Sequence, residues 1–366
     1  MDNKKHIVNG GSRKLSNQGM TIFGATTNMI FRYRVHKAVN WNKAIDEFTQ
    51  MFWAQNLKQF WTDEEYIPSK DRSVWNNKMS NPMKKAYKRV LAGLTLLDTK
   101  QANVGMPNIT DYILDLQRKA VLSFMGMMEH IHAKSYSTIF TTIIEEREID
   151  ELFDWVEENK HLQTKADIIT SYYDNINDKK SLYMAMVASV FLESFLFYSG
   201  FFLPLWLSGG GDGGVSKMVA SGEIIKKIVQ DESIHGVYVG LLAQELFEEL
   251  TPQEQEEVTK ETFELLDKLM ENEKAYTEYI YDEIGLTHEV KTFIKYNANK
   301  ALDNLGFDNY YEGAYDINPI VENALRTESE NNDQFSTKGK SYVKAIHRAL
   351  TDEDFSFGNR TPLLTV

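Results

Sequence analysis

The sequence predicts an all-α protein. Apolar side chains recur at intervals of three and four over most of the chain, and no stretch alternates with period two. Of the 366 residues, 42% are hydrophobic, which is sufficient for a large core. We predict an N-terminal extension, partly disordered, over 1–38, a helical domain over 39–325 and a flexible C-terminal tail over 326–366.

Local signals set the ends of the predicted helices. A loop is expected at 66–75, a helix start at Pro82, a stop near Gly105 and a glycine-rich loop at 208–214. The segment 251–254 reads as a capping box, in which the first and fourth side chains cap each other's backbone. The expected helices are 39–61, 82–105, one through 127–140, 146–159, 165–177, 181–207, one through 225–242, 252–283 and 290–304.

Composition and charge exclude several classes of protein. A formal net charge of -13 argues against a general nucleic-acid binder, because phosphates are neutralised by clustered Lys and Arg. The apolar stretch 182–207 is interrupted by Glu193 and by serines, so we expect a buried core helix rather than a membrane span. No secretory signal is recognised in 1–34. With no cysteine, disulfides and thiolate ligands are excluded, and a cytoplasmic location is expected.

The most informative stretch is 127–140, MMEHIHAKSYSTIF. It holds Glu129, His132 and Tyr136 at offsets of three and four, which places the three side chains on one face of a helix. The same face is otherwise apolar, so it is directed into the core. A second Glu-x-x-His, Glu232 and His235, lies on an equally apolar stripe. Buried polar groups need partners, and two such pairs indicate a metal site.

Two further acids are predicted to face the core. Asp98 follows Leu94 by four residues on an apolar helix face, and Glu193 shares a face with Val190 and Phe197. Four carboxylates in an apolar interior would repel one another strongly, and some would have to take up protons. Two divalent cations would balance them while the two histidines stay neutral. The charge count therefore predicts a dinuclear site.

The types of ligand atom indicate which metal ions could bind and which fold could hold them. Oxygen ligands with one nitrogen per ion favour manganese or iron over structural zinc or Cu(I). One carboxylate from each of two helices, with Glu-x-x-His from each of two others, is the pattern of ferritin-like dimetal bundles. A lone inward histidine is more often an ordinary core residue, but two pairs with two further acids outweigh that interpretation. We therefore expect a ferritin-like helical bundle that holds two manganese or two iron ions per chain through Asp98, Glu129, His132, Glu193, Glu232 and His235.

Tyr136 lies one helical turn beyond His132 on the same face. A core tyrosine whose hydroxyl is hydrogen-bonded is one interpretation, and such residues are frequent. The other is a phenol that the metal site oxidises. Spacing alone leaves both open.

Several longer stretches between about 38 and 357 carry a family resemblance. They are AVNWN, GLTLLDT, MEHIHAKSYS, LESFLFYSGF, DESIHGVYVG and YNANKALDNLGF. With them the chain resembles the radical-generating small (β) subunit of class I ribonucleotide reductase, an oxidoreductase that makes deoxyribonucleotides for DNA replication. The nearest resemblance is to the manganese-using class Ib branch.

The resemblance implies roles for individual residues. Asp98, Glu129 and His132 would bind one metal ion, and Glu193, Glu232 and His235 the other. Tyr136 would be the stable radical site.

Three more residues would carry the oxidising equivalent outward: Trp61, Asp231, which links Trp61 to His132, and Tyr342 in the tail. The acidic and aromatic segment 352–357 would dock on the large subunit. From the sequence pattern alone, Trp61 would be an ordinary core residue and Asp231 a solvated one.

The resemblance also implies partners: a second copy in a homodimer, the large catalytic subunit and a flavodoxin-like activator protein. The extension, the loop 208–214 and the last residues, 358–366, depart from the family pattern. Two alternatives remain at this point. One is a ligand-binding oxidase on the same bundle, and the other is a non-enzymatic ferritin-like metal store.

Overall fold

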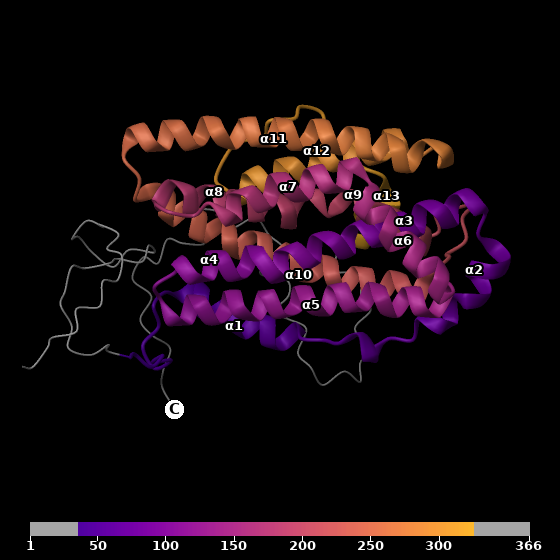
Figure 1. Cartoon of the computed structure of the whole chain (residues 1–366), viewed down its shortest axis with the longest axis horizontal. Helices are drawn as coiled ribbons and strands as arrows, with labels where there is room; N and C mark the ends of the chain where they lie inside the picture. Colours follow the sequence, from indigo (N-terminus) through magenta and orange to yellow (C-terminus); the bar gives the residue numbers. More distant parts are fainter. Residues whose placement is uncertain (1–35, 326–366) are drawn as a thin grey trace, which may run out of the picture.

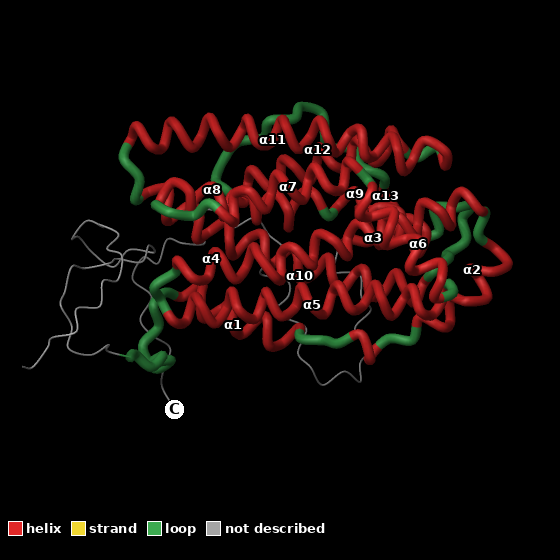
Figure 2. Tube along the Cα trace, viewed as in Figure 1, coloured by secondary structure: helices red, strands yellow, loops and turns green. Residues whose placement is uncertain are grey.

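The computed structural model describes residues 36–325, which form a bundle of helices (Figures 1 and 2). No strand occurs in this range, so the predicted all-α class is confirmed. The α-helices are α1 (Glu47–Gln59), α2 (Arg72–Lys78), α3 (Asn81–Lys100), α4 (Met106–Tyr112), α5 (Leu116–Ile143), α6 (Glu146–Glu158), α7 (Lys160–Asp174), α8 (Lys179–Phe191), α9 (Tyr198–Ser208), α10 (Val219–Glu248), α11 (Pro252–Tyr281), α12 (Thr287–Asn304) and α13 (Pro319–Leu325). The shorter turns are η1 (Asp63–Glu65), η2 (Pro68–Asp71) and η5 (Asp282–Ile284), which are 3-10 helical, and η3 (Gln101–Gly105) and η4 (Leu192–Leu196), which are π-helical.

Four long helical segments make up the centre of the bundle: α3, α5, α10 and the segment that comprises α8, η4 and α9. α3 packs on α5, and α10 packs on α8 and α9, while α5 also touches α10. In Figure 1, α1 and α5 lie along one side of the molecule, and α11 and α12 lie along the opposite side. The inner faces of these helices are apolar, as expected for a bundle that buries one stripe of each helix.

The most apolar segment of the chain is a core element. Lys179–Ser208, which comprises α8, η4 and α9, is long and apolar enough to cross a membrane, but its most apolar window is completely buried in the protein. The surrounding helices thus take the place that lipid would have around a membrane span. The predicted buried helix is therefore confirmed.

Side-chain caps explain where two helices begin. The helix predicted from Val39 starts only at Glu47, because residues 40–42 form a local turn and the Asp46 side chain accepts from the backbone N–H of Thr49. Similarly, α7 begins at Lys160 rather than at 165, because the Asn159 side chain caps its first turn.

Other boundaries were predicted with mixed success. The predicted loop 66–75 is wrong, because it contains η2 and the start of α2. The predicted stop at Gly105 is also wrong: the chain continues through η3 into α4, where Pro107 is near the helix start and needs no intrahelical N–H bond. Helix α13 was not predicted. In contrast, the capping box of α11 is formed by Thr251 and Glu254, and the loop 208–214 contains glycines with positive φ.

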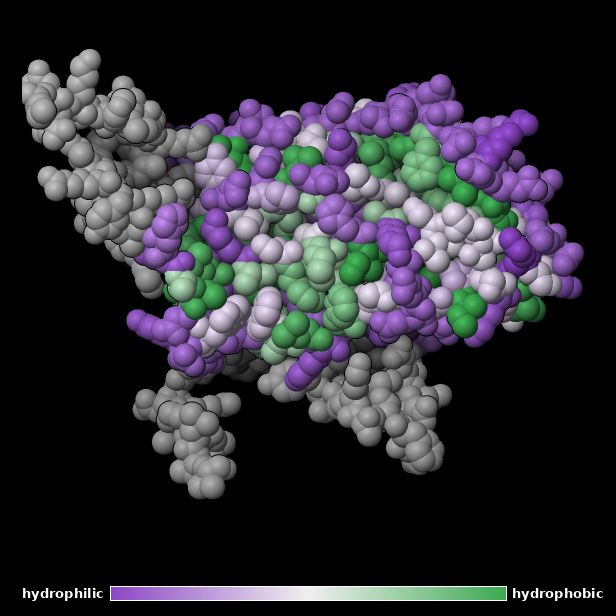
Figure 3. All heavy atoms as spheres, turned by 60° about the horizontal axis from the view of Figure 1, so that its bottom comes forward, coloured by the Kyte–Doolittle hydropathy of each residue, from purple (hydrophilic) through white to green (hydrophobic). Residues whose placement is uncertain are grey.

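The segment that leads from α1 towards Trp61 is held on α5 by aromatic side chains. Phe124 contacts the rings of Trp53 and Phe60, each with ring centroids 6.1 Å apart. Figure 3 shows the side of the molecule on which α1 and α5 lie, where hydrophobic groups occur among hydrophilic ones. Phe60 and Met127 are among the exposed apolar residues. The ring contacts of Phe124 with Trp53 and Phe60 hold the end of α1 against the first half of α5.

The division of the chain at 38 and 325 stays a prediction. Residues 1–35 of the predicted extension and the predicted tail 326–366 lie outside the described residues, and so do Tyr342 and the segment 352–357.

Candidate metal centre

The six predicted ligands come from four separate helical segments and meet in the middle of the bundle. Their side chains are completely buried, with an exposed fraction of 0% for each residue. Asp98 lies near the end of α3, Glu193 lies in η4, and α5 and α10 each contribute one Glu-x-x-His pair. The six residues selected from sequence spacing therefore lie on inward helix faces and close to one another.

The ligands form two overlapping groups, each of which could hold a metal ion. In each group, the ligand atoms lie within 4.8 Å of one another, and each group contains one histidine of its own. The groups are Asp98, Glu129, His132 and Glu232, and Glu129, Glu193, Glu232 and His235. Glu129 and Glu232 therefore belong to both groups, which spacing along the sequence does not reveal.

Distances around the two imidazoles define the shared acids. Nδ1 of His132 lies 3.0 Å from Oε1 of Glu232 and 3.3 Å from Oδ1 of Asp98. Nδ1 of His235 lies 2.7 Å from Oε1 of Glu129 and 3.2 Å from Oε2 of Glu232. Each oxygen of Glu232 thus faces a different histidine, as a carboxylate that bridges two cations would.

The donor atoms of this cluster fit a pair of cations. Buried polar atoms in proteins are almost always hydrogen-bonded. Within the described part of the chain, both carboxylate oxygens of Asp98, Glu129 and Glu232 are buried without a hydrogen-bond partner, and so is Nδ1 of both histidines. Lone pairs that converge without a donor are what metal ligands provide, so the residues present suit a dimetal site.

Electrostatics supports the same conclusion. Burial, with repulsion from neighbouring acids, raises the pKa of Asp98 and of Glu193 well above the ordinary carboxyl range. Burial also opposes the charge of Glu232, but His132 outweighs it and lowers the pKa of Glu232. The protein alone therefore cannot keep all four acids charged. Two cations would remove the repulsion and allow every carboxylate to ionise.

The π-helical turn η3 contributes an amide that sequence analysis missed. The side-chain N–H₂ group of Gln101 donates to Glu193 and to the hydroxyl of Ser189, and its carbonyl accepts from the Tyr173 hydroxyl at 2.8 Å. A side chain at Gly105 would collide with Gln101, since its Cβ would lie 2.2 Å from Oε1. The only signal in the sequence was a polar residue three positions after Asp98.

A second network joins the cluster to the end of α1. Trp61 donates from Nε1 to Oδ2 of Asp231 at 2.7 Å, and the same oxygen lies 3.0 Å from Nε2 of His132. The rings of Trp61 and His132 are stacked, with centroids 6.0 Å apart and an interplanar angle of 17°. Asp231 is only 2% exposed, so the solvated position that pattern alone assigned to it is wrong. Its partners Trp61 and His132 explain how its charge is tolerated in the core.

Tyr136 is completely buried on the face of α5 that carries His132. Its hydroxyl has no hydrogen-bond partner among the described residues, so the hydrogen-bonded core tyrosine is not what the structure contains. Burial, reinforced by the charges of Asp98, Glu232 and Glu129, raises the pKa of Tyr136 well above 10. The phenol therefore keeps its proton at neutral pH.

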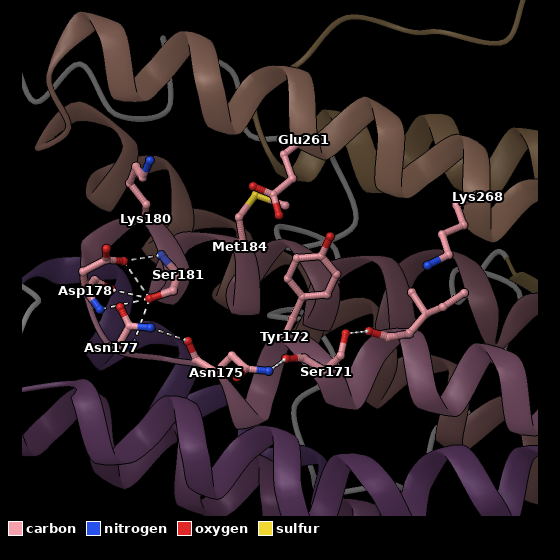
Figure 4. A pocket seen from close by; sticks show the side chains of 11 residues that line it. Ser171, Tyr172, Asn175, Asn177, Asp178, Lys180, Ser181, Met184, Glu261 and Lys268 are labelled. Carbon is pink, nitrogen blue, oxygen red and sulfur yellow. Dashed lines mark hydrogen bonds between the residues drawn. The ribbon is translucent and has the colours of Figure 1, made fainter.

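A surface pocket of about 390 Å³ is lined by other residues than those of the cluster (Figure 4). It is formed by α7, α8 and α11, and Tyr172 and Lys268 are among its walls. Its hydrogen bonds between Asp178 and Ser181 belong to the cap of α8. No residue of the metal centre lines this pocket, so we assign the chemistry to the buried cluster.

Comparison with curated proteins gives consistent matches along most of the chain. A ribonucleoside-diphosphate reductase subunit beta of Bacillus phage SPbeta is 53% identical over 327 residues, which cover 88% of this chain and 97% of that protein. The protein of the same name from Bacillus subtilis is 52% identical over 327 residues, with the same coverage. These similarities do not favour the metal-store and ligand-binding-oxidase alternatives.

Comparison with solved structures and family models agrees with the geometry. The dimanganese(II)-NrdF of Streptococcus sanguinis is 44% identical and superimposes with a TM-score of 0.75, covering 80% of this chain and all of that one. The family model described as ribonucleotide reductase, small chain, matches residues 38–319. The ferritin-like fold and the resemblance to class I small subunits, close to class Ib, are thereby confirmed. The chain belongs to the ribonucleotide reductase small-chain family.

Proposed function

We propose that this small subunit binds two ions of manganese or iron in the buried cluster and uses them to convert Tyr136 into a stable radical. The radical would start the reduction of ribonucleotides in the large subunit. Six buried ligand residues lie together beside a buried tyrosine, and many of their oxygen and nitrogen atoms have no hydrogen-bond partner among the described residues. This observation carries the proposal. Asp98 would bind one ion and Glu193 the other, with Glu129 and Glu232 shared between them.

The burial of Tyr136 accounts for a long-lived radical. The bound ions, once oxidised by oxygen or by an oxidant derived from it, would supply the oxidising power that removes an electron from the phenol. Because burial raises its pKa, the phenol is protonated beforehand and must lose a proton as well as an electron; Asp98, the carboxylate whose charge acts most strongly on the phenol, would accept the proton. The side chain is 0% exposed, so solvent reductants cannot touch the product. A nucleotide cannot reach it either, and the oxidising equivalent must therefore leave through the protein.

Asp231 would orient the two residues that it joins in the outgoing route, His132 and Trp61. As an acceptor for Nε2–H of His132, it fixes the tautomer in which Nδ1 is free to bind a metal ion. As an acceptor for the Trp61 indole, it joins that ring to the cluster. Trp61 and Asp231 would thus carry the oxidising equivalent outward. Tyr342, outside the described residues, would pass it to the large subunit.

The proposed partners follow from family membership. We expect a homodimer that works with the large catalytic subunit in the cytoplasm. A flavodoxin-like protein would deliver the oxidant when manganese is used. Support for manganese comes from the Streptococcus sanguinis relative, whose structure is that of a dimanganese(II) protein.

Electron paramagnetic resonance on metal-loaded, activated protein tests the proposal. We expect a tyrosyl signal in the wild type and none in Tyr136→Phe, with the same two metal ions bound per chain. Tyr183→Phe is a matched control, because Tyr183 is also buried with an unpartnered hydroxyl in the described chain. An unchanged signal in Tyr136→Phe would remove that residue from the scheme.

A further inference from the structure

The last residue of α1, Gln59, forms a hydrogen bond that belongs neither to the metal ligands nor to the route proposed above. Its side-chain Nε2 donates to Oδ1 of Asp231 at 2.7 Å. Oδ2 of the same carboxylate accepts from the Trp61 indole and faces Nε2 of His132. Asp231 therefore has one oxygen for the route and the other for Gln59.

The Gln59 amide is held in the orientation that allows it to donate. Its carbonyl Oε1 accepts from Nε2 of Gln55 at 2.9 Å, and Gln55 is 2% exposed. If the Gln59 amide were turned over, its carbonyl would face the Asp231 carboxylate and its N–H₂ group would face the N–H₂ group of Gln55. Both contacts would be repulsive, so the chain Gln55, Gln59, Asp231 has one favourable direction.

Holding Oδ1 matters because a carboxylate can rotate about its terminal bond. With Oδ1 restrained, a single oxygen, Oδ2, joins the Trp61 indole to the His132 imidazole. Without the restraint, the two donors could bind different oxygens, and water could reach Asp231 from the side where the half-buried Gln59 now lies. Charge transfer depends on fixed contacts, so loss of this arrangement would slow it.

We propose that Gln59 is a positioning residue that fixes Asp231 for radical transfer between the buried centre and Trp61. This inference rests on the proposed function, in which Trp61 and Asp231 form the outgoing route. Among the described residues, the Gln59 side chain is hydrogen-bonded to Gln55 and Asp231 and to none of the six metal ligands, so its contribution is to transfer rather than to metal binding.

The central variant is Gln59→Met, which keeps the length of the side chain but removes the donor. We expect unchanged metal content and an unchanged yield of Tyr136 radical. Nucleotide reduction with the large subunit should fall by about three- to tenfold, the effect expected for one hydrogen bond that acts on the transfer step. Gln50→Met is the matched control: Gln50 is on the same helix and is also half-buried, but its amide donates to Gln117.

A second measurement does not depend on turnover. In full-length protein loaded with diamagnetic zinc, exchange of the Trp61 indole proton with solvent can be followed by NMR of ¹⁵N-labelled tryptophan. We expect faster exchange at Trp61 in Gln59→Met, but not in Gln50→Met. The indole of Trp75, which is buried at 4% exposure elsewhere, should be unchanged and reports global loosening.

The outcomes separate this inference from the proposed function. If Trp61→Phe and Asp231→Asn retain full turnover, the outgoing route itself is wrong. If those variants are inactive while Gln59→Met has normal turnover and normal Trp61 exchange, the route stands and the role of Gln59 is refuted. Loss of metal or of the Tyr136 radical in Gln59→Met would also refute it, because Gln59 would then support the centre itself.

Discussion

Two buried clusters of charged residues in this bundle differ in how their charge is compensated. Lys165 and Glu273 form an ion pair at 2.5 Å with exposed fractions of 1% and 0%. The Ser199 hydroxyl donates to Glu273, and the Tyr276 ring lies 4.0 Å from the Lys165 ammonium. One positive and one negative group balance each other, and their neighbours supply further contacts. Here the protein neutralises its own charge.

The metal centre has no such internal balance. Four acids and two histidines face one another, and many of their donor atoms lack a partner within residues 36–325. Buried acids without compensation are strongly unfavourable. The comparison teaches that burial of charge alone does not identify a metal site. A metal site is indicated where buried acids outnumber basic groups and their oxygen atoms lack hydrogen-bond partners.

The largest expected effect comes from Glu232→Ala, which removes a carboxylate shared by both ligand groups. We expect loss of both ions and of nucleotide reduction, whereas Glu193→Ala should affect mainly one ion, because Glu193 belongs to one group. Metal analysis and turnover with the large subunit measure these effects. Two ions bound by Glu232→Ala would show that the acid is not a shared ligand.

The self-balanced cluster should respond in the opposite way. Lys165→Met leaves Glu273 buried without its cation and should lower the free energy of unfolding by about 3–5 kcal/mol. Adding Glu273→Leu should recover most of this loss, because no unpaired charge remains. Chemical denaturation of both variants measures the effect. Equal stability of the single and double variants would contradict the proposed balance.

A third case, the acid Asp63, extends the comparison to the edge of the bundle. Burial raises its pKa, but Lys134 and Thr138 on α5 outweigh this and lower the pKa below 3.8. Its stabilising contribution is therefore complete above pH 3.8 and is lost as the pH falls through the lower folded-state value. Lys134 is 60% exposed, so solvent screens the pair and the effect should be the smallest of those predicted here.

Comparison of wild type with Asp63→Asn measures this contribution. The difference in unfolding free energy should be constant near neutral pH and should shrink below about pH 4, where the unfolded chain begins to take up the proton. A difference that grows as the pH falls would contradict the sign of the pKa shift.

Sequence was sufficient for the parts of the structure that depend on helical periodicity. Offsets of three and four correctly placed Glu129 and His132, and Glu232 and His235, on inward faces. The capping box of α11 also followed from local chemistry. These features are determined within one turn of helix, so no knowledge of neighbouring helices is needed.

Several features that depend on contacts between helices were not predicted. The π-helical turns η3 and η4 shift the helical register without a clear compositional signal, and Gln101 lies in one of them. Sharing of Glu232 between two ligand groups depends on how α5 and α10 approach each other. Gln59 and Asp231 are 172 residues apart, so no local pattern joins them.

Metal loading tests the central claim most directly, because the claim is that this acid-rich core exists to hold two cations. Full-length protein should be equilibrated with manganese(II); one portion is freed of excess ion and analysed for metal, and the other is unfolded by denaturant at a fixed free ion concentration. We predict two ions per chain and a free energy of unfolding higher by about 2.7 kcal/mol for each site at a free ion concentration one hundred times its dissociation constant. Wild-type protein that binds no manganese and gains no stability would contradict the account.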